Sequence, residues 1–215
     1  MTGCDRSVFS RHLYFQAGQR YFGENYAQEC MTKAEEKNSQ TGFEGICWHF
    51  IGPLQSNKAA PLIKHLGTDL KCVETVSTLK LAQKLNHAVE TLLKDIGSQS
   101  YTLGIYLQIN TSGEDTKSGI EPDEITDLAR DIVQSCPHLR ILGVMTIGAP
   151  DDYTCFDKLA ACRKILAEAL GIQDETTLEL SMGMSGDFEE AIRRGATNVR
   201  IGSTIFGARD YSKST

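Results

Sequence analysis

The residues best suited to binding an anion lie in two glycine- and serine-rich loops near the C-terminal end of the chain. Ser181-Met182-Gly183-Met184-Ser185 forms the first loop and Gly202-Ser203-Thr204 the second. Glycine lets a backbone approach a ligand closely, and free N–H groups and hydroxyls are donors that a phosphate accepts from. The two loops therefore predict a phosphate-binding cradle, although ordinary strand-to-helix turns contain the same residue types.

Each loop follows a short apolar strand that must position it. These strands are expected at 178–180 and 198–201, and one short helix joins them. Asp187 is a suitable N-cap for that helix, Glu190 stands at the capping-box position, and Gly195 suits the end of the helix. Barrels of alternating strands and helices commonly bind phosphate at the loops after their last two strands.

The rest of the chain alternates apolar strands with amphipathic helices. Seven strands are expected, and they start near residues 21, 47, 71, 102, 141, 178 and 198. Helices are expected over 7–17, 26–38, 54–66, 78–95 and 153–170, and another begins at Pro122. Pro61 should break or kink the helix in which it lies. This alternation indicates a parallel sheet covered by helices.

The fold class that we predict is an α/β TIM barrel in a single domain over residues 1–215. A closed barrel of this type has eight strands, so the first strand would be missing here. The alternative is an open doubly wound sheet. That fold more usually places its phosphate loop after the first strand, whereas the candidate loops lie after the last two.

The composition of the chain limits the classes of binding partner that we expect. The chain has 215 residues, 40% of them hydrophobic and 23% charged, with a net charge of −6. The basic residues are scattered, so nucleic acid is not expected as a partner. No apolar run is long enough to span a bilayer, and Asp5 weakens a mitochondrial leader beside Arg6 and Arg11. We therefore expect a cytoplasmic protein without membrane contact.

The sequence lacks the motifs of several families of enzymes and metal-binding proteins. The chain has seven cysteines but no C-x-x-C pair, and its five histidines lack H-E-x-x-H spacing. This pattern is typical of reduced thiols rather than of a disulfide framework or a zinc site. Neither a Walker A loop nor G-x-G-x-x-G occurs. No metal is expected.

Six motifs, taken in chain order, identify a family. They read FGENY at 22–26, WHFIGPLQSNK at 48–58, QINT at 108–111 with KSG at 117–119, GVMTI at 143–147, SMGMS at 181–185, and VRIG at 199–202 continuing to IFGAR at 205–209. These motifs closely resemble those of the pyridoxal phosphate homeostasis proteins, the YggS/PROSC family, and the match as a whole extends in the right order over nearly all of residues 18–211. The resemblance implies a barrel like the N-terminal domain of alanine racemase. It also implies that the chain binds pyridoxal 5′-phosphate (PLP) and serves intracellular homeostasis of this vitamin B6 cofactor without catalytic turnover.

The same resemblance implies which residues contact PLP. Four residues match the family's phosphate-binding loops: Met184, Ser185, Gly202 and Ser203. Arg200 matches the arginine that faces the pyridine nitrogen. Its guanidinium stays protonated, so it would leave that nitrogen unprotonated and make the cofactor a poor electron sink.

Asn25 and His49 resemble contacts at the side of the cofactor ring. Both are expected at the ends of barrel strands, where ligand groups gather. His49 lies between Trp48 and Phe50. A hydrogen-bonded core histidine is therefore an equally good interpretation of His49.

The main departure from the family concerns a lysine. The family carries its Schiff-base lysine on the first strand, ahead of the FGENY motif, but residues 1–19 contain no lysine. We therefore expect PLP to be held without a covalent bond. Lys58 and Lys117 follow strand ends and could replace the missing anchor, although loop lysines are usually solvated. A truncated gene model, an isoform and a degenerate paralogue all remain open as explanations.

Three functions follow from these observations. The favoured one is a PLP-binding homeostasis protein, with PLP-requiring apoenzymes as recipients of the cofactor. The second is a PLP-dependent amino-acid racemase, which would need the absent lysine, a second acid/base group and an additional β domain. The third is a fragment without ligand, because a missing strand would leave two exposed sheet edges.

Overall fold

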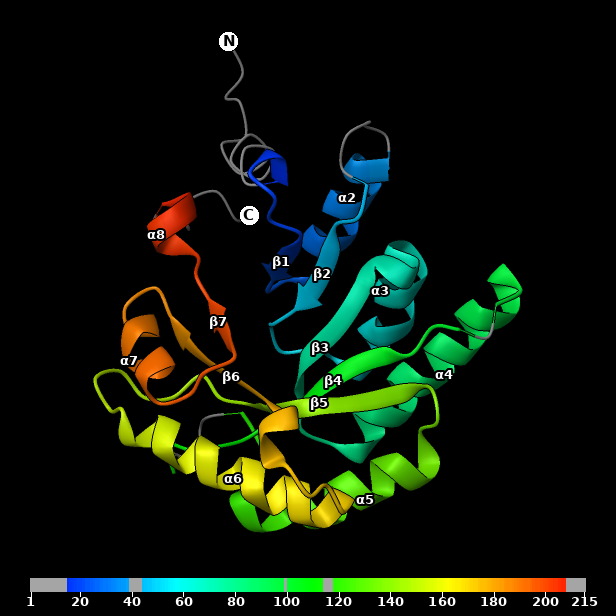
Figure 1. The fold of residues 1–215 in the computed structure, drawn as a ribbon. Coiled ribbons are helices and arrows are strands. Elements are labelled where there is room, and N and C mark those ends of the chain that lie inside the picture. Colours follow the sequence, from blue (N-terminus) through cyan, green and yellow to red (C-terminus); the bar gives the residue numbers. More distant parts are fainter. Residues whose placement is uncertain (1–14, 39–43, 99, 114–117, 208–215) are drawn as a thin grey trace.

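The computed structural model describes residues 15–38, 44–98, 100–113 and 118–207. Within these residues, parallel strands form one sheet in which the strand order follows the chain (Figure 1). The seven strands are β1 (Tyr21–Glu24), β2 (Cys47–Phe50), β3 (Leu70–Val76), β4 (Leu103–Gln108), β5 (Leu139–Met145), β6 (Glu179–Met184) and β7 (Asn198–Arg200). The predicted number of strands is confirmed for the described part of the chain.

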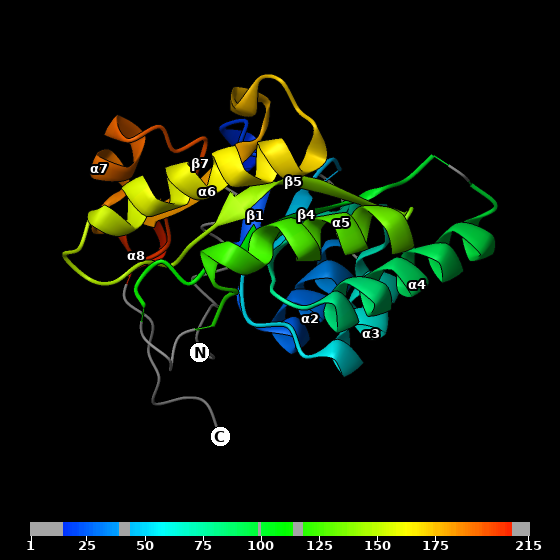
Figure 2. The ribbon, with the colours of Figure 1, turned by 90° about the horizontal axis from the view of Figure 1, so that it is seen from below.

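Helices connect the strands and cover the outer face of the curved sheet. They are α2 (Ala27–Asn38), α3 (Ala59–Leu66), α4 (Leu79–Ile96), α5 (Ile125–Ser135), α6 (Thr154–Leu170), α7 (Phe188–Arg193) and α8 (Ser203–Phe206). Short 3₁₀ turns lie at Ser56–Lys58, Gly67–Asp69, Pro122–Glu124 and Glu175–Thr177. Figure 2 shows α3, α4, α5 and α6 following one another around the sheet. The main hydrophobic core fills the space between this helical layer and the sheet.

Helix α4 illustrates how local sequence sets these elements. Thr78 caps it by accepting a hydrogen bond from the Leu81 N–H at 3.2 Å, and Gly97 ends it with a left-handed φ of 64°. Leu85 and Val89 lie on its buried face. The predicted helix over 78–95 is thus confirmed with one residue of difference at each end.

The order of the strands decides between the two predicted sheet architectures. A doubly wound sheet reverses its strand order at a switch point, but here each strand pairs with its neighbours in the chain from β1 to β7. The doubly wound alternative is therefore wrong, and the barrel prediction is confirmed. No pairing joins β1 to β7 in the part of the chain that the structure describes.

Four local predictions need correction. Residues 181–184 were expected in a loop but belong to β6, and the helix over 54–66 starts only at Ala59, so Pro61 lies in its first turn and does not break it. Asp187 does not cap α7 with its side chain but accepts a hydrogen bond from the Met184 N–H at 2.5 Å. Glu190 pairs with Arg193 and Arg194 and makes no capping box.

The predicted helix over 7–17 lies mostly outside the described residues. Among the helices that are described, none combines the length and the apolar character needed to cross a membrane.

Candidate functional site

The loops after β6 and β7 meet at the hydroxyl of Ser185. Its Oγ accepts a hydrogen bond from the Gly202 N–H at 3.1 Å and another from the Thr204 N–H at 3.4 Å. Two backbone amides therefore converge on a single oxygen atom. A Cβ added at Gly202 would meet no heavy atom within 4 Å, so the space beside this backbone is open. The two N–H groups, which here donate to the Ser185 Oγ, mark a position where an anionic oxygen could accept from the same donors.

Gly183 lies near the end of β6, just before this loop. Its φ is +92°, a conformation that side chains rarely adopt, and a Cβ there would lie 2.5 Å from the Cβ of Ala191. The register between β6 and β7 shifts between Ser181 and Met184 at this point. Glycine is required here because both the backbone angle and the close approach of α7 exclude a side chain.

Arg200 lies at the end of β7 with its guanidinium turned inward. The side chain is 7% exposed. Its two terminal nitrogens donate to the Ser181 Oγ at 2.6 Å and to the Thr146 carbonyl oxygen at 2.7 Å. Burial lowers the pKa of Arg200, but the negative charge of Glu74 opposes this change. An arginine in such a position remains protonated at neutral pH.

Glu74 on β3 is the centre of the hydrogen-bond network inside the barrel. Its side chain is 1% exposed. Oε1 accepts from the Asn198 amide at 2.9 Å and lies 2.8 Å from the His49 Nδ1, and Oε2 accepts from the Ser181 hydroxyl at 2.6 Å. The Arg200 guanidinium lies 4.0 Å from Oε2. Three strands other than β3 thus supply the partners of this one carboxylate.

The surroundings of Glu74 keep it ionised. Burial by itself would raise the pKa of this carboxyl group, but the hydrogen bond from His49, the charge of Arg200 and the hydrogen bond from Ser181 outweigh burial and lower it. A buried carboxylate with several donors and a nearby cation is stabilised in its charged form. The group therefore acts as a hydrogen-bond acceptor at neutral pH.

His49 is oriented by this carboxylate. Because an ionised carboxylate only accepts hydrogen bonds, the His49 Nδ1 must carry the proton between the two groups. The ring also makes an edge contact with Tyr21, with 5.5 Å between centroids, and the side chain is 17% exposed. His49 is therefore a hydrogen-bonded histidine that still reaches the interior space of the barrel.

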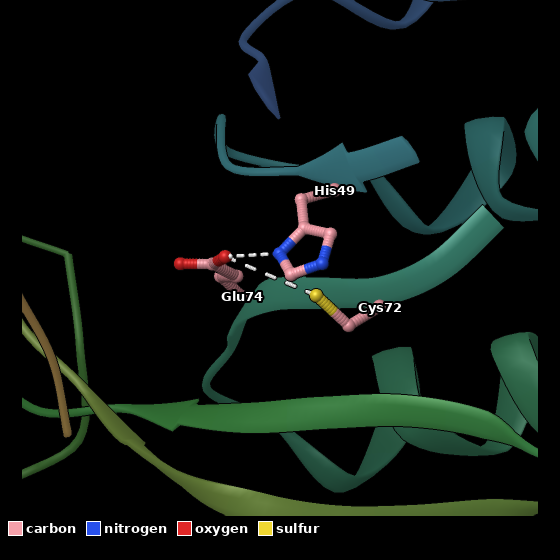
Figure 3. A group of neighbouring side chains, drawn as sticks. All are labelled: His49, Cys72 and Glu74. Atoms are coloured by element: carbon pink, nitrogen blue, oxygen red, sulfur yellow. Dashed lines mark hydrogen bonds and ion pairs between the residues drawn. The ribbon is translucent and has the colours of Figure 1, made fainter. Parts of the chain in front are cut away.

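His49, Cys72 and Glu74 bring three potential metal-binding atoms within 4.8 Å of one another (Figure 3). Burial, together with the charges of Glu74 and Glu179, raises the pKa of the Cys72 thiol well above its usual range. The Cys72 Sγ donates to the Glu74 Oε1 at 3.9 Å, an oxygen that already accepts from His49 and Asn198. These contacts describe a protonated thiol in a hydrogen-bonded cluster.

A second polar pair lies further down the same interior. The Tyr106 hydroxyl donates to the Glu179 Oε2 at 2.6 Å. Burial and this hydrogen bond raise the pKa of Tyr106 far above its ordinary value. Tyr106 packs with Cys72 and Met145 in a small apolar cluster separate from the main core. Alternate residues of the strands face the interior, so this cluster is the floor beneath Glu74.

The structure brings some of the predicted site residues together and leaves others apart. Ser185 and Gly202 meet directly, and Arg200 is linked to His49 through Ser181 and Glu74. The other three predicted residues, all classed as exposed, are Asn25, Met184 and Ser203. The backbone oxygen of Asn25 would lie 1.9 Å from a Cβ on Gly52, so the loops after β1 and β2 touch. Lys58 is exposed, and Lys117 lies outside the described residues.

The sequence interpretation missed three of the residues that organise the site, Glu74, Thr146 and Asn198. It placed the fourth, Ser181, in the phosphate-binding loop, whereas the structure places its hydroxyl between Glu74 and Arg200. One signal was available for Glu74, because it follows the apolar residues Cys72 and Val73 in a predicted strand, and a charged residue requires a partner when it is buried. The partners themselves lie on distant strands and carry no local signal.

Comparisons with known proteins agree with this architecture. Residues 11–210 match the family described as alanine racemase, N-terminal domain. The chain is 45% identical over 206 residues to the pyridoxal phosphate homeostasis protein of Mus musculus, covering 91% of this chain and 71% of that protein. It is 42% identical to the protein of the same name from Vibrio alginolyticus, covering 92% and 80% respectively.

Several solved structures are similar in fold to this chain. PipY of Synechococcus elongatus without PLP has a TM-score of 0.74 and 28% identity, covering 93% of this chain and 87% of PipY. The same protein with PLP bound has a TM-score of 0.71 and 26% identity, covering 94% and 87% respectively. Alanine racemase from Clostridium difficile shares the fold. Its TM-score is 0.63 and its identity 16%, and the match covers 96% of this chain and 50% of the racemase chain.

Proposed function

Because this chain belongs to the pyridoxal phosphate homeostasis protein family, we propose that it binds PLP at the mouth of its barrel and acts as a carrier in PLP homeostasis. Membership of the family confirms the resemblance predicted from the six sequence motifs. The proposal for this chain rests on one observation above all: the amides of Gly202 and Thr204 converge on Ser185 at the ends of β6 and β7.

The residues present suit the parts of the cofactor. The convergent amides and the Ser185 hydroxyl would hold the phosphate, and the inward guanidinium of Arg200 would face the pyridine ring. When bound, PLP supplies an electrophilic aldehyde conjugated to an electron-withdrawing ring. A protonated arginine beside the ring nitrogen keeps that nitrogen unprotonated, which weakens the electron-withdrawing effect and suits a carrier, or at most a narrow racemase-like chemistry.

We propose that residues 1–215 hold the cofactor without a covalent bond. Lysine is absent from residues 1–19, and Lys58 is exposed at the start of α3. Affinity then depends on the phosphate cradle and Arg200, and a ligand held in this way can be released to another protein. PLP-requiring apoenzymes are the recipients that we propose.

The experiment that tests this function compares PLP, pyridoxal and inorganic phosphate as ligands of the purified chain. Thermal unfolding and equilibrium dialysis should show saturable binding of PLP, with much weaker binding of pyridoxal because it lacks the phosphate. Absence of any shift with PLP would contradict the proposal.

Two further assays separate a carrier from an enzyme. Borohydride treatment with PLP, followed by peptide mapping, should give no single modified lysine, whereas a specific adduct at Lys58 or Lys117 would show a substitute anchor. The chain should not interconvert D- and L-alanine; measurable turnover would favour the racemase alternative.

A further inference from the structure

We propose that Glu74 is a positioning residue for the ligand site: acting through Ser181, it orients Arg200 toward the ligand, and by direct contact it fixes the tautomer of His49. This inference rests on the proposed PLP function only in assigning the ligand. Its geometric part concerns the protein alone.

Hydrogen-bond direction carries the first step. Ser181 has one hydroxyl proton and lies 2.6 Å from both the Glu74 Oε2 and an Arg200 nitrogen. An ionised carboxylate cannot donate a hydrogen bond, and a guanidinium cannot accept one. The Ser181 hydroxyl must therefore donate to Glu74 and accept from Arg200. The bonds thus run in one direction, from Arg200 through Ser181 to Glu74. The other terminal nitrogen of Arg200 is held by the Thr146 carbonyl at 2.7 Å.

The same rule determines which ring nitrogen of His49 carries the proton. Its Nδ1 lies 2.8 Å from the Glu74 Oε1, so that nitrogen carries the proton. In the neutral ring, the Nε2 is then left as an acceptor. A neutral histidine that presents its Nε2 as an acceptor binds different ligand groups from one that presents a donor. Glu74 determines which of the two is present, because it holds the proton on the Nδ1.

Charge balance gives the third step. Arg200 is 7% exposed, and Glu74, at 1% exposure, places its carboxylate 4.0 Å from the guanidinium. The groups facing Glu74 are His49, Cys72, Ser181, Asn198 and Arg200, and the Tyr106–Glu179 pair lies beyond them. Without the carboxylate, the buried guanidinium loses its nearest anion and should leave its inward position.

A double-mutant cycle tests whether Glu74 acts through Arg200. Glu74→Gln preserves shape but removes the charge, and it should weaken PLP binding by about tenfold in the wild-type background. In an Arg200→Ala background the same substitution should have a clearly smaller effect on PLP affinity, because only the contribution through His49 remains and coupled residues are not additive. Equal effects in both backgrounds would overturn the proposal.

Glu179→Gln is the matched control. Glu179 is another carboxylate inside the barrel that accepts from a hydroxyl, but its partner is Tyr106 and not the network around Arg200. PLP affinity should stay within about twofold of the wild type. A loss equal to that of Glu74→Gln would show a general effect of interior carboxylates and would contradict a specific role for Glu74.

The unliganded protein provides a second readout. Nitrogen-15 NMR of the His49 ring should show a proton on Nδ1 in the wild-type chain and a changed proton distribution in Glu74→Gln, with circular dichroism confirming that both variants are folded. An unchanged ring signal would overturn the role of Glu74 in fixing His49. Failure of the wild-type chain to bind PLP would instead refute the proposed function, while the NMR result would still decide the tautomer.

Discussion

The carboxylate of Glu74 and the side-chain amide of Asn198 form a 2.9 Å hydrogen bond across the inside of the barrel. Glu74 lies on β3 and Asn198 on β7, and three strands separate them in the sheet. The bond therefore joins parts of the sheet that share no ladder. Together with the Ser181 contact at 2.6 Å, it holds the two sides of the interior at a fixed separation.

Acid should remove the stability that Glu74 provides. Its folded pKa is lowered, so its contribution is fully present above the unfolded value of about 4.3 and is lost as pH falls through the folded pKa. Urea unfolding from pH 7 downward should show a steeper loss in the wild type than in Glu74→Gln. Other carboxylates are common to both proteins and cancel in the difference. Identical pH profiles would contradict this assignment.

Gly183→Ala should destabilise the fold. The substitution places a side chain at a φ of +92° and only 2.5 Å from the Cβ of Ala191. We expect a loss of about 2–4 kcal/mol in the free energy of unfolding. Gly186→Ala is the control, because a Cβ there meets nothing within 4 Å, and its effect should stay within about 0.5 kcal/mol. Chemical denaturation of both variants measures the difference; equal losses would argue against a specific requirement at Gly183.

Ser185→Ala should weaken PLP binding more than it weakens the fold. The substitution removes the oxygen on which the Gly202 and Thr204 amides converge, at 3.1 and 3.4 Å. Equilibrium dialysis should show a roughly tenfold loss of PLP affinity. In the control, Ser135→Ala, the lost hydroxyl donates to the Asp131 carbonyl on α5, and PLP affinity should be unchanged. If Ser185→Ala bound PLP with wild-type affinity, the phosphate would have to bind at another position.

Tyr106 should remain protonated where tyrosines normally ionise, at about pH 10. Burial and the bond to Glu179 both raise its pKa. An ultraviolet titration of the folded protein should therefore give the same number of ionising tyrosines in the wild type and in Tyr106→Phe. One fewer ionising group in the variant would show that the floor of the barrel is accessible to solvent.

Local patterns along the chain were enough to predict the elements and their order. Apolar periodicity and turn residues are local signals, and they were enough to predict the seven strands and the helix that ends at Gly97. The motif around Ser185 likewise drew attention to the loop whose hydroxyl meets the Gly202 and Thr204 amides, because glycine and serine act through their own backbone and hydroxyl. Where local propensity competed with pairing, as in residues 181–184, the prediction was wrong, since pairing with β5 and β7 draws these residues into β6.

Only the tertiary structure decided which side chains meet inside the barrel. Ser181 and Asn198 lie 107 and 124 residues from Glu74, and no spacing rule connects them to it. Curvature of the sheet brings these positions together, and burial then makes each polar group depend on the others for hydrogen bonds. The chain encodes the strands locally, but the chemistry of the site arises from contacts across the barrel.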